Sequence, residues 1–136
     1  MAVSKDHVIS SSLQDKAFNS SSFFDFVKDL LDKISNNEKC VLIMDNVSFH
    51  KSKKIIDMVN SKGHLILFIP PYSPQCNPIE EVFSELKRKY RSCNEDNFID
   101  KIKLSITKLN PNNFEGYFYH SIQFIQNRIN VTNVIA

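Results

Sequence analysis

Two carboxylates, Asp45 and Glu80, occupy positions at which an acidic residue could do chemistry. Asp45 directly follows the apolar run Val41–Met44, which is typical of a buried strand in a parallel sheet. Ligands of open α/β sheets bind outside the carboxyl ends of the strands, so this position favours a functional role. The alternative is that Asp45 caps a turn through its own backbone.

Glu80 comes shortly after Pro78, whose fixed φ suits the start of a helix. The helix dipole favours a carboxylate in the first helical turn. The alternative role is therefore that of a dipole-stabilising surface acid, and it applies to Glu81 as well. Successive side chains of a helix point about 100° apart, so Glu80 and Glu81 should not face the same site.

If that helix packs against the sheet near the strand end, Asp45 and Glu80 can share a divalent cation. Carboxylate oxygens suit Mg²⁺ or Mn²⁺, which keep several waters and bind substrate phosphates. In two-metal sites, such ions stabilise the attacking and leaving oxygens of phosphoryl transfer. A site of this kind usually needs a third carboxylate, so one acid on a strand and one on a helix would hold a metal loosely.

The helices that position these carboxylates are predicted from apolar residues that recur at i, i+3 and i+4. Five segments show this spacing: a helix capped by Ser20 or Ser21 with its apolar face from Phe23 to Ile34, one capped by Ser52 and ended by Gly63, one after Pro78 that buries Ile79, Val82, Phe83 and Leu86, and two more over about 95–109 and 113–130.

Two apolar runs, Val41–Met44 and residues 65–69, predict parallel strands that are covered on both faces. Residues 8–13 alternate weakly after a polar turn at residues 5–7, so residues 1–4 are expected to be the remainder of a preceding hairpin strand. The order of these elements implies an α/β layer with a partly parallel sheet and right-handed crossovers.

Composition places the chain among single-domain globular proteins. It has 136 residues, 42% hydrophobic and 24% charged, which indicates neither disorder nor a membrane protein. Residues 1–13 show no secretory signal pattern, so we expect an intracellular protein, nuclear if eukaryotic and cytoplasmic if bacterial. Cys40, Cys76 and Cys93 form no C-x-x-C pair and are expected to be reduced thiols.

The net charge of +2, from 17 basic and 15 acidic residues, makes no strong claim on nucleic acid by itself. Four bases gather in one short segment, namely Lys87, Arg88, Lys89 and Arg91. They could contact DNA phosphates, which contributes affinity without sequence information. The alternative for each is a solvated helix face.

Two segments carry a resemblance to a known family. Residues 44–50, MDNVSFH, and residues 69–87, IPPYSPQCNPIEEVFSELK, resemble the catalytic domain of mariner-type DDE transposases and of the related bacterial insertion-sequence transposases. The resemblance covers about residues 23–91 and implies a ribonuclease H-like fold. It also implies that Asp45 is the second catalytic acid and Glu80 the third, that two Mg²⁺ or Mn²⁺ ions are bound, and that DNA is cleaved and joined by a water or 3′-hydroxyl nucleophile.

Neighbouring residues support this assignment in several ways. His50 matches the Asp-Asn-x-x-x-His pattern of the family; it is expected either near the metal or substrate phosphate, or as a residue that orients the loop by hydrogen bonding. Asn46 and Asn77 are expected to organise loop backbone beside the two acids. Tyr72 could stack on a base, although packing against the neighbouring prolines is the favoured expectation.

The chain departs from the family pattern at its start. The first catalytic Asp of the family lies on the first strand of the sheet, and neither Asp6 nor Asp15 replaces it. We therefore expect residues 1–136 to form a single, partial catalytic domain: a ribonuclease H-like mixed sheet flanked by helices, with the first strand missing and extra helices at the C-terminus.

This departure leaves two functional hypotheses. The first is a transposase domain with weak or no strand-cutting activity as an isolated chain. The alternative is a non-enzymatic ribonuclease H-like remnant that binds DNA or a transposase subunit. An unpaired sheet edge tends to pair with another chain, so self-association into a homo-oligomer is also expected.

Overall fold

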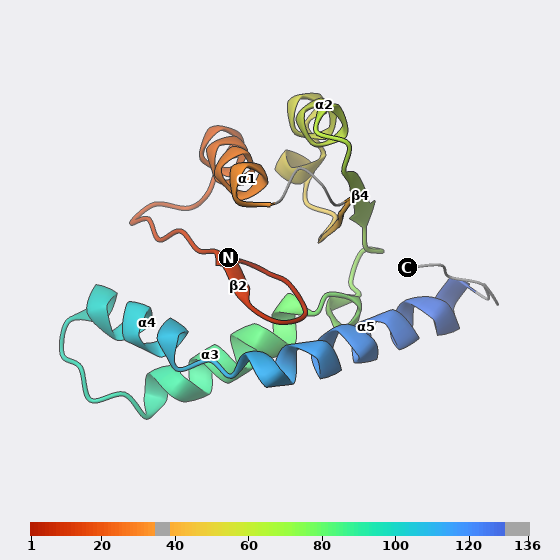
Figure 1. The fold of residues 1–136 in the computed structure, drawn as a ribbon. Helices are drawn as coiled ribbons and strands as arrows, with labels where there is room; N and C mark the ends of the chain where they lie inside the picture. Colours follow the sequence, from red (N-terminus) through yellow and green to blue (C-terminus); the bar gives the residue numbers. More distant parts are fainter. Residues whose placement is uncertain (35–38, 130–136) are drawn as a thin grey trace.

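A short hairpin begins the structure, which is a computed structural model that describes residues 1–34 and 39–129 (Figure 1). Strand β1 (Ala2–Val3) pairs antiparallel with β2 (Val8–Ser10). The Ser4 N–H donates to the His7 carbonyl at 2.9 Å and closes the turn. The hairpin predicted from the alternation of residues 8–13 is therefore confirmed.

Helix α1 (Ser20–Lys33) buries the side chains of Val27, Leu30 and Leu31. Its N-cap is Asn19 rather than Ser20 or Ser21. The Asn19 side chain accepts the N–H groups of Ser21 and Ser22, both at 3.0 Å. The Asn19 N–H in turn donates to the Ser22 hydroxyl at 3.0 Å. This reciprocal pair of bonds needs an acceptor three residues before Ser22, which is why the cap lies earlier than predicted.

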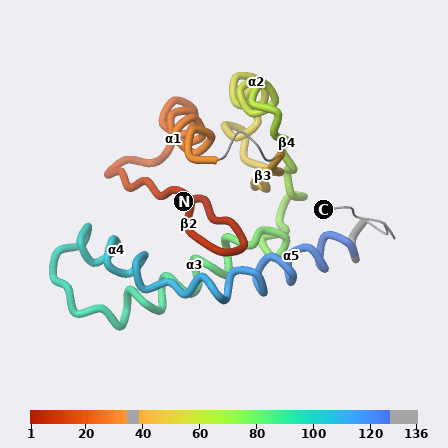
Figure 2. Tube along the Cα trace, in the orientation of Figure 1, coloured from red at the N-terminus to blue at the C-terminus, as the bar shows by residue number. Residues whose placement is uncertain are grey.

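Strands β3 (Val41–Met44) and β4 (Leu65–Phe68) pair in parallel, from Val41 opposite Leu65 to Met44 opposite Phe68 (Figure 2). Helix α2 (Lys53–Ser61) makes the crossover between them, and Gly63 follows it with φ of 82°, which suits a residue without a Cβ. The predicted parallel pair is thus confirmed.

The prediction that both faces of this pair are covered is wrong. Leu42 and Met44 are buried in a core cluster that contains residues of α1 and α2. On the opposite face, Val41 is 54% exposed and Leu65 is 46% exposed. Continuous apolar runs predict full burial, but here both α1 and α2 lie on one side of the pair.

The hairpin and the parallel pair form two separate two-stranded sheets, whereas the sequence predicted one mixed sheet. The hairpin lies between two layers and packs on both. Ala2 and Ile9 contact the core cluster of α1 and α2, and Val3 and Val8 contact a second cluster. Successive side chains of these short strands therefore point to opposite faces and contact the two layers in turn.

The second layer is helical and lies below the sheets in Figure 1. It contains α3 (Ile79–Arg91), α4 (Phe98–Thr107) and α5 (Phe114–Ile129), close to the predicted segments. Val82, Leu109 and Phe114 form its buried centre. Among the described residues, no helix is both long enough and apolar enough to cross a lipid bilayer. The fold is a mixed α/β arrangement of small sheets and helices.

Candidate active site

Asp45 lies directly after the carboxyl end of β3, where the sequence placed it. Its side chain is 51% exposed and its Oδ1 lies 2.5 Å from Nδ1 of His50. The same ring nitrogen lies 3.3 Å from the Asp45 backbone carbonyl oxygen. Both neighbours of Nδ1 are acceptors, so Nδ1–H is the donor in this contact.

Aromatic rings fix the position of this imidazole. His50 lies in a short 3₁₀ turn, η1 (Ser48–Lys51), and its side chain is 15% exposed. Its ring stacks on Phe23 of α1, with ring centroids 4.0 Å apart, and meets Phe49 edge-on at 4.5 Å. His50 thus contacts both the Asp45 carboxylate and the backbone of its loop.

Asn46, the neighbour of Asp45, has an unsatisfied side chain. Its Oδ1 is buried and has no hydrogen-bond partner among the described residues. A buried acceptor without a partner costs about 1–3 kcal/mol, so Asn46 carries an unsatisfied polar atom next to Asp45 in the chain.

The loop between β4 and α3 carries Tyr72 at its tip. Tyr72 has φ of 54° and its side chain is 100% exposed. Packing of this ring against the neighbouring prolines, which the sequence favoured, is therefore wrong. A non-glycine residue in the left-handed region costs about 1–2 kcal/mol, and the exposed ring recovers none of this through packing.

Glu80 lies in the first turn of α3, which Asn77 helps to order. The Asn77 side chain accepts the Ile79 N–H at 3.3 Å, and its carbonyl accepts the Glu80 N–H at 3.1 Å. Glu80 is exposed, and within the described residues its carboxylate has no hydrogen bond or ion pair. The Glu81 carboxylate instead lies 3.3 Å from His120 of α5, so Glu80 is the acid of this turn that stays open.

The described residues contain no group of three or more His, Cys, Asp or Glu side chains that could hold a metal ion. The chemistry of the donors present nevertheless fits a divalent cation that keeps most of its waters. Asp45 and Glu80 are exposed and offer hard carboxylate oxygens. Mg²⁺ is commonly held by one or two carboxylates together with substrate phosphates.

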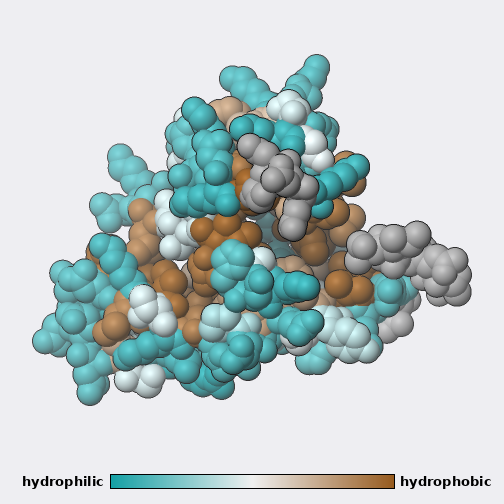
Figure 3. All heavy atoms as spheres, viewed as in Figure 1, coloured by the Kyte–Doolittle hydropathy of each residue, from teal (hydrophilic) through white to brown (hydrophobic). Residues whose placement is uncertain are grey.

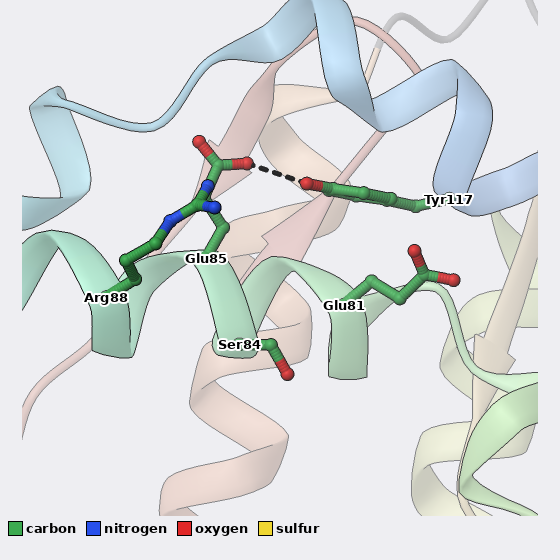
Figure 4. A pocket seen from close by; sticks show the side chains of 5 residues that line it. All are labelled: Glu81, Ser84, Glu85, Arg88 and Tyr117. Carbon is green, nitrogen blue, oxygen red and sulfur yellow. Dashed lines mark hydrogen bonds between the residues drawn. The ribbon is translucent and has the colours of Figure 1, made fainter.

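The four clustered bases of α3 separate in space. Lys87 and Arg91 line an apolar groove toward α4. Arg88 lines a different pocket together with Glu81 and Glu85, as Figure 4 shows. Lys87 and Arg91 therefore line a groove that contains no acidic residue, whereas Arg88 shares its pocket with two glutamates.

Glu85 was missed by sequence reasoning. It is 3% exposed and accepts a hydrogen bond from the Tyr117 hydroxyl at 2.9 Å (Figure 4). It also accepts the Asn110 N–H at 3.0 Å and the Asn113 amide at 3.3 Å. The local pattern carried only a partial signal, because Glu85 lies three residues after Val82 and so near the predicted buried face.

Burial and hydrogen bonding act in opposite directions on this carboxyl. Burial alone raises the pKa of Glu85, but the bonds from Asn110, Tyr117 and Asn113, with the charge of Lys89, hold it below its ordinary value. Burial and the neighbouring Glu85 carboxylate both raise the pKa of Tyr117. Glu85 is thus an ionised carboxylate that joins α3 to the segment that leads into α5.

The comparison with known families bears on residues 1–105, which match the family described as DDE superfamily endonuclease. The chain therefore belongs to this family, and its domain is of the DDE transposase type. The search of curated proteins gave no match. The match includes Asp45, Glu80 and the groove residues of α3, and it ends before Asn110, the first donor to Glu85.

Proposed function

We propose that this chain is a catalytic domain of a mariner-type DDE transposase, or of a related bacterial insertion-sequence transposase, and that residues 1–136 belong to one domain. The activity is divalent-metal-dependent cleavage and transfer of DNA strands. One observation carries the proposal: within a chain of this family, Asp45 stands at the end of a parallel strand, half-exposed, and His50 contacts its carboxylate at 2.5 Å.

In this proposal Asp45 and Glu80 hold Mg²⁺ or Mn²⁺, and His50 orients the Asp45 carboxylate. When bound, the ion neutralises charge on the reacting phosphate and supplies an activated water. Asn77 orders the first turn of α3 and thereby fixes the backbone position of Glu80. Tyr72 stacks on a base near the cut, which accounts for an exposed ring on a strained backbone.

The weak cutting expected of this chain follows from the number of its ligands. Asp45 and Glu80 are two carboxylates, and the described residues contain no group of three or more metal-binding side chains. A cation held this way depends on the phosphate of the DNA as a further ligand. Metal and DNA should therefore bind together more tightly than either binds alone.

The lack of a group of three or more metal-binding side chains among the described residues also favours a second candidate, a non-enzymatic module that binds DNA or a transposase subunit. Such a module would use the bases of α3 and would be indifferent to divalent ions. The two candidates differ in whether a cation strengthens DNA binding through Asp45 and Glu80.

Fluorescence anisotropy of a labelled DNA duplex, with and without Ca²⁺, tests this difference, because Ca²⁺ also takes carboxylate ligands. We expect Ca²⁺ to strengthen binding at least several-fold in the natural chain, but not in Asp45→Asn or Glu80→Gln. Asp57→Asn is the matched control, since Asp57 is an exposed acid of α2 and should leave the Ca²⁺ effect intact.

Three results would change the proposal. DNA binding that ignores Ca²⁺ in every variant would establish the non-enzymatic candidate instead. A Ca²⁺ effect that survives both Asp45→Asn and Glu80→Gln would show that other residues hold the cation. Failure to bind DNA under any condition would contradict the transposase candidate and leave only a module that binds a transposase subunit.

A further inference from the structure

An apolar groove lies between α3 and α4, at the opposite end of α3 from Glu80. Its floor is made by the side chains of Leu13, Leu86, Tyr90, Phe98 and Ile102. The cavity measures about 440 Å³, within the range of small-ligand sites. Figure 3 shows apolar surface in this region of the molecule.

An aromatic ring is the most exposed part of this floor. Phe98 is 62% exposed, although it begins a helix and packs edge-on against Tyr90, with ring centroids 6.3 Å apart. Lys101 lies over the Tyr90 ring, with its Nζ 4.8 Å from the centroid. Because Lys101 already occupies that ring, Phe98 is the surface left free for stacking.

Two cations form the rim of the groove. Lys87 and Arg91 are exposed, and within the described residues neither makes an ion pair with a carboxylate. A ligand of this groove therefore meets an apolar, aromatic floor with positive charge at its edge. A nucleotide complements both features, because its phosphate is negatively charged and its base can stack on an aromatic ring.

Helix geometry connects the groove with the candidate active site. Lys87 and Arg91 follow Glu80 by seven and eleven residues, which places all three within about 40° on one face of α3. Along the axis, they lie about 10 Å and 16 Å from Glu80. A strand with about 3.4 Å per nucleotide covers this distance in about three to five nucleotides.

We propose that this groove binds an unpaired base of the DNA strand, which stacks on Phe98 while the flanking phosphates lie on Lys87 and Arg91. The inference rests on the proposed function in taking DNA as the substrate. The base must be unpaired, because a paired base is stacked within its duplex and its ring faces are covered. An apolar floor suits stacking of any base, since stacking does not require hydrogen bonds to base edges.

The groove can be tested with single-stranded and duplex oligonucleotides in EDTA, where the carboxylates of the candidate active site hold no cation. The probes are a labelled 12-nucleotide oligothymidine and a duplex of the same length, followed by anisotropy. We expect Phe98→Leu to weaken binding of the single strand about 10-fold while changing duplex binding less than twofold. Because Phe98 is exposed, this variant should fold as the natural chain does. Circular dichroism checks this.

Two further variants complete the design. Phe124→Leu is the matched control, because Phe124 is 47% exposed on α5, outside the groove; it should bind both probes as the natural chain does. Lys87→Gln should weaken both probes and reduce the dependence of binding on salt, as expected for a phosphate contact.

The proposal is overturned if Phe98→Leu binds the single strand as tightly as the natural chain, or if it weakens both probes equally. It is also overturned if a 12-residue peptide of alternating Leu and Glu binds more tightly than the single strand and loses its affinity in Phe98→Leu, because the groove would then be a protein-docking site. Binding in EDTA reports on the groove alone, and the Ca²⁺ effect reports on Asp45 and Glu80, so failure of the cation effect and failure of the groove are distinguishable.

Discussion

The end of β3 and the junction of α3 with α5 each centre on one carboxylate, and the two carboxylates are held very differently. The Asp45 side chain is 51% exposed and has one side-chain partner, His50. Glu85 is 3% exposed and accepts hydrogen bonds from three protein donors. Glu85 has little remaining capacity to accept a ligand, whereas Asp45 keeps most of its acceptor sites open.

This difference separates an acid that the protein saturates with donors from one that stays open, which we propose to be functional. A carboxylate that the protein saturates with donors stabilises the fold, and an open one that is oriented from one side is suited to an incoming cation. The position of the donors agrees with this view, because Asn110, Asn113 and Tyr117 all lie beyond residue 105, where the family match ends. Glu85 therefore attaches a segment outside the matched region to the helix that carries Glu80.

The largest effect is expected from Glu85→Ala. This variant empties a buried position and removes the acceptor of the Asn110 N–H and the Tyr117 hydroxyl, which should lower the free energy of unfolding by about 3 kcal/mol. Asp45→Ala should lower it by less than about 1 kcal/mol, because the side chain is half-exposed. Urea denaturation measures both values, and equal losses would contradict the division into structural and functional acids.

His50→Ala should have the next largest effect, and on cation binding rather than on the fold. It removes the side-chain partner of Asp45, and loss of such an outer partner typically weakens metal binding about 10–100-fold. The readout is the Ca²⁺ concentration needed to strengthen DNA binding. His120→Ala is the control, since His120 contacts Glu81 rather than Asp45. If both variants shift this concentration equally, His50 does not position Asp45.

Tyr72→Gly should act in opposite directions on stability and on DNA binding. Glycine adopts positive φ without a Cβ penalty, so thermal unfolding should show a gain of about 1 kcal/mol. DNA affinity should fall because the stacking ring is lost. Tyr72→Ala should weaken DNA binding equally without the gain in stability. Unchanged DNA affinity in both variants would exclude Tyr72 from the DNA-binding surface.

The smallest effect is the dependence of stability on pH through Glu85. The pKa of Glu85 in the folded chain lies below its ordinary value, so ionised Glu85 stabilises the fold. This stabilisation is fully present above the unfolded pKa of about 4.3 and is lost as the pH falls through the folded pKa. The effect is small because burial offsets much of what the hydrogen bonds contribute. Asp6 and Asp29 also have lowered pKa values, so the Glu85 share is the difference from Glu85→Gln, which should lose less stability on acidification.

Local patterns in the sequence predicted the elements of the fold well. Apolar spacing located the helices, and the run Val41–Met44 placed Asp45 at a strand end. Gly63 marked the end of α2 because a positive φ at that point requires it. These features depend on residues that are near one another in the chain, so a single sequence carries them.

Features that depend on distant residues were not predicted. The burial of Glu85 requires donors that lie 25 to 32 residues further along the chain. The exposure of Val41 depends on both α1 and α2 lying on one face of the parallel pair. Tyr72 projects fully into solvent because of its backbone conformation, which residue type alone does not reveal.

The proposed function requires that Asp45 and Glu80 share one divalent cation. This can be measured by titrating ¹⁵N-labelled chain with Mn²⁺, because a paramagnetic ion broadens nearby amide signals even when it binds weakly. We predict that amides of residues 45–50 and 79–82 broaden together over one range of Mn²⁺ concentration, and that Asp45→Asn removes both effects. Broadening at residues 79–82 that survives Asp45→Asn, or broadening centred on other acids, would contradict it.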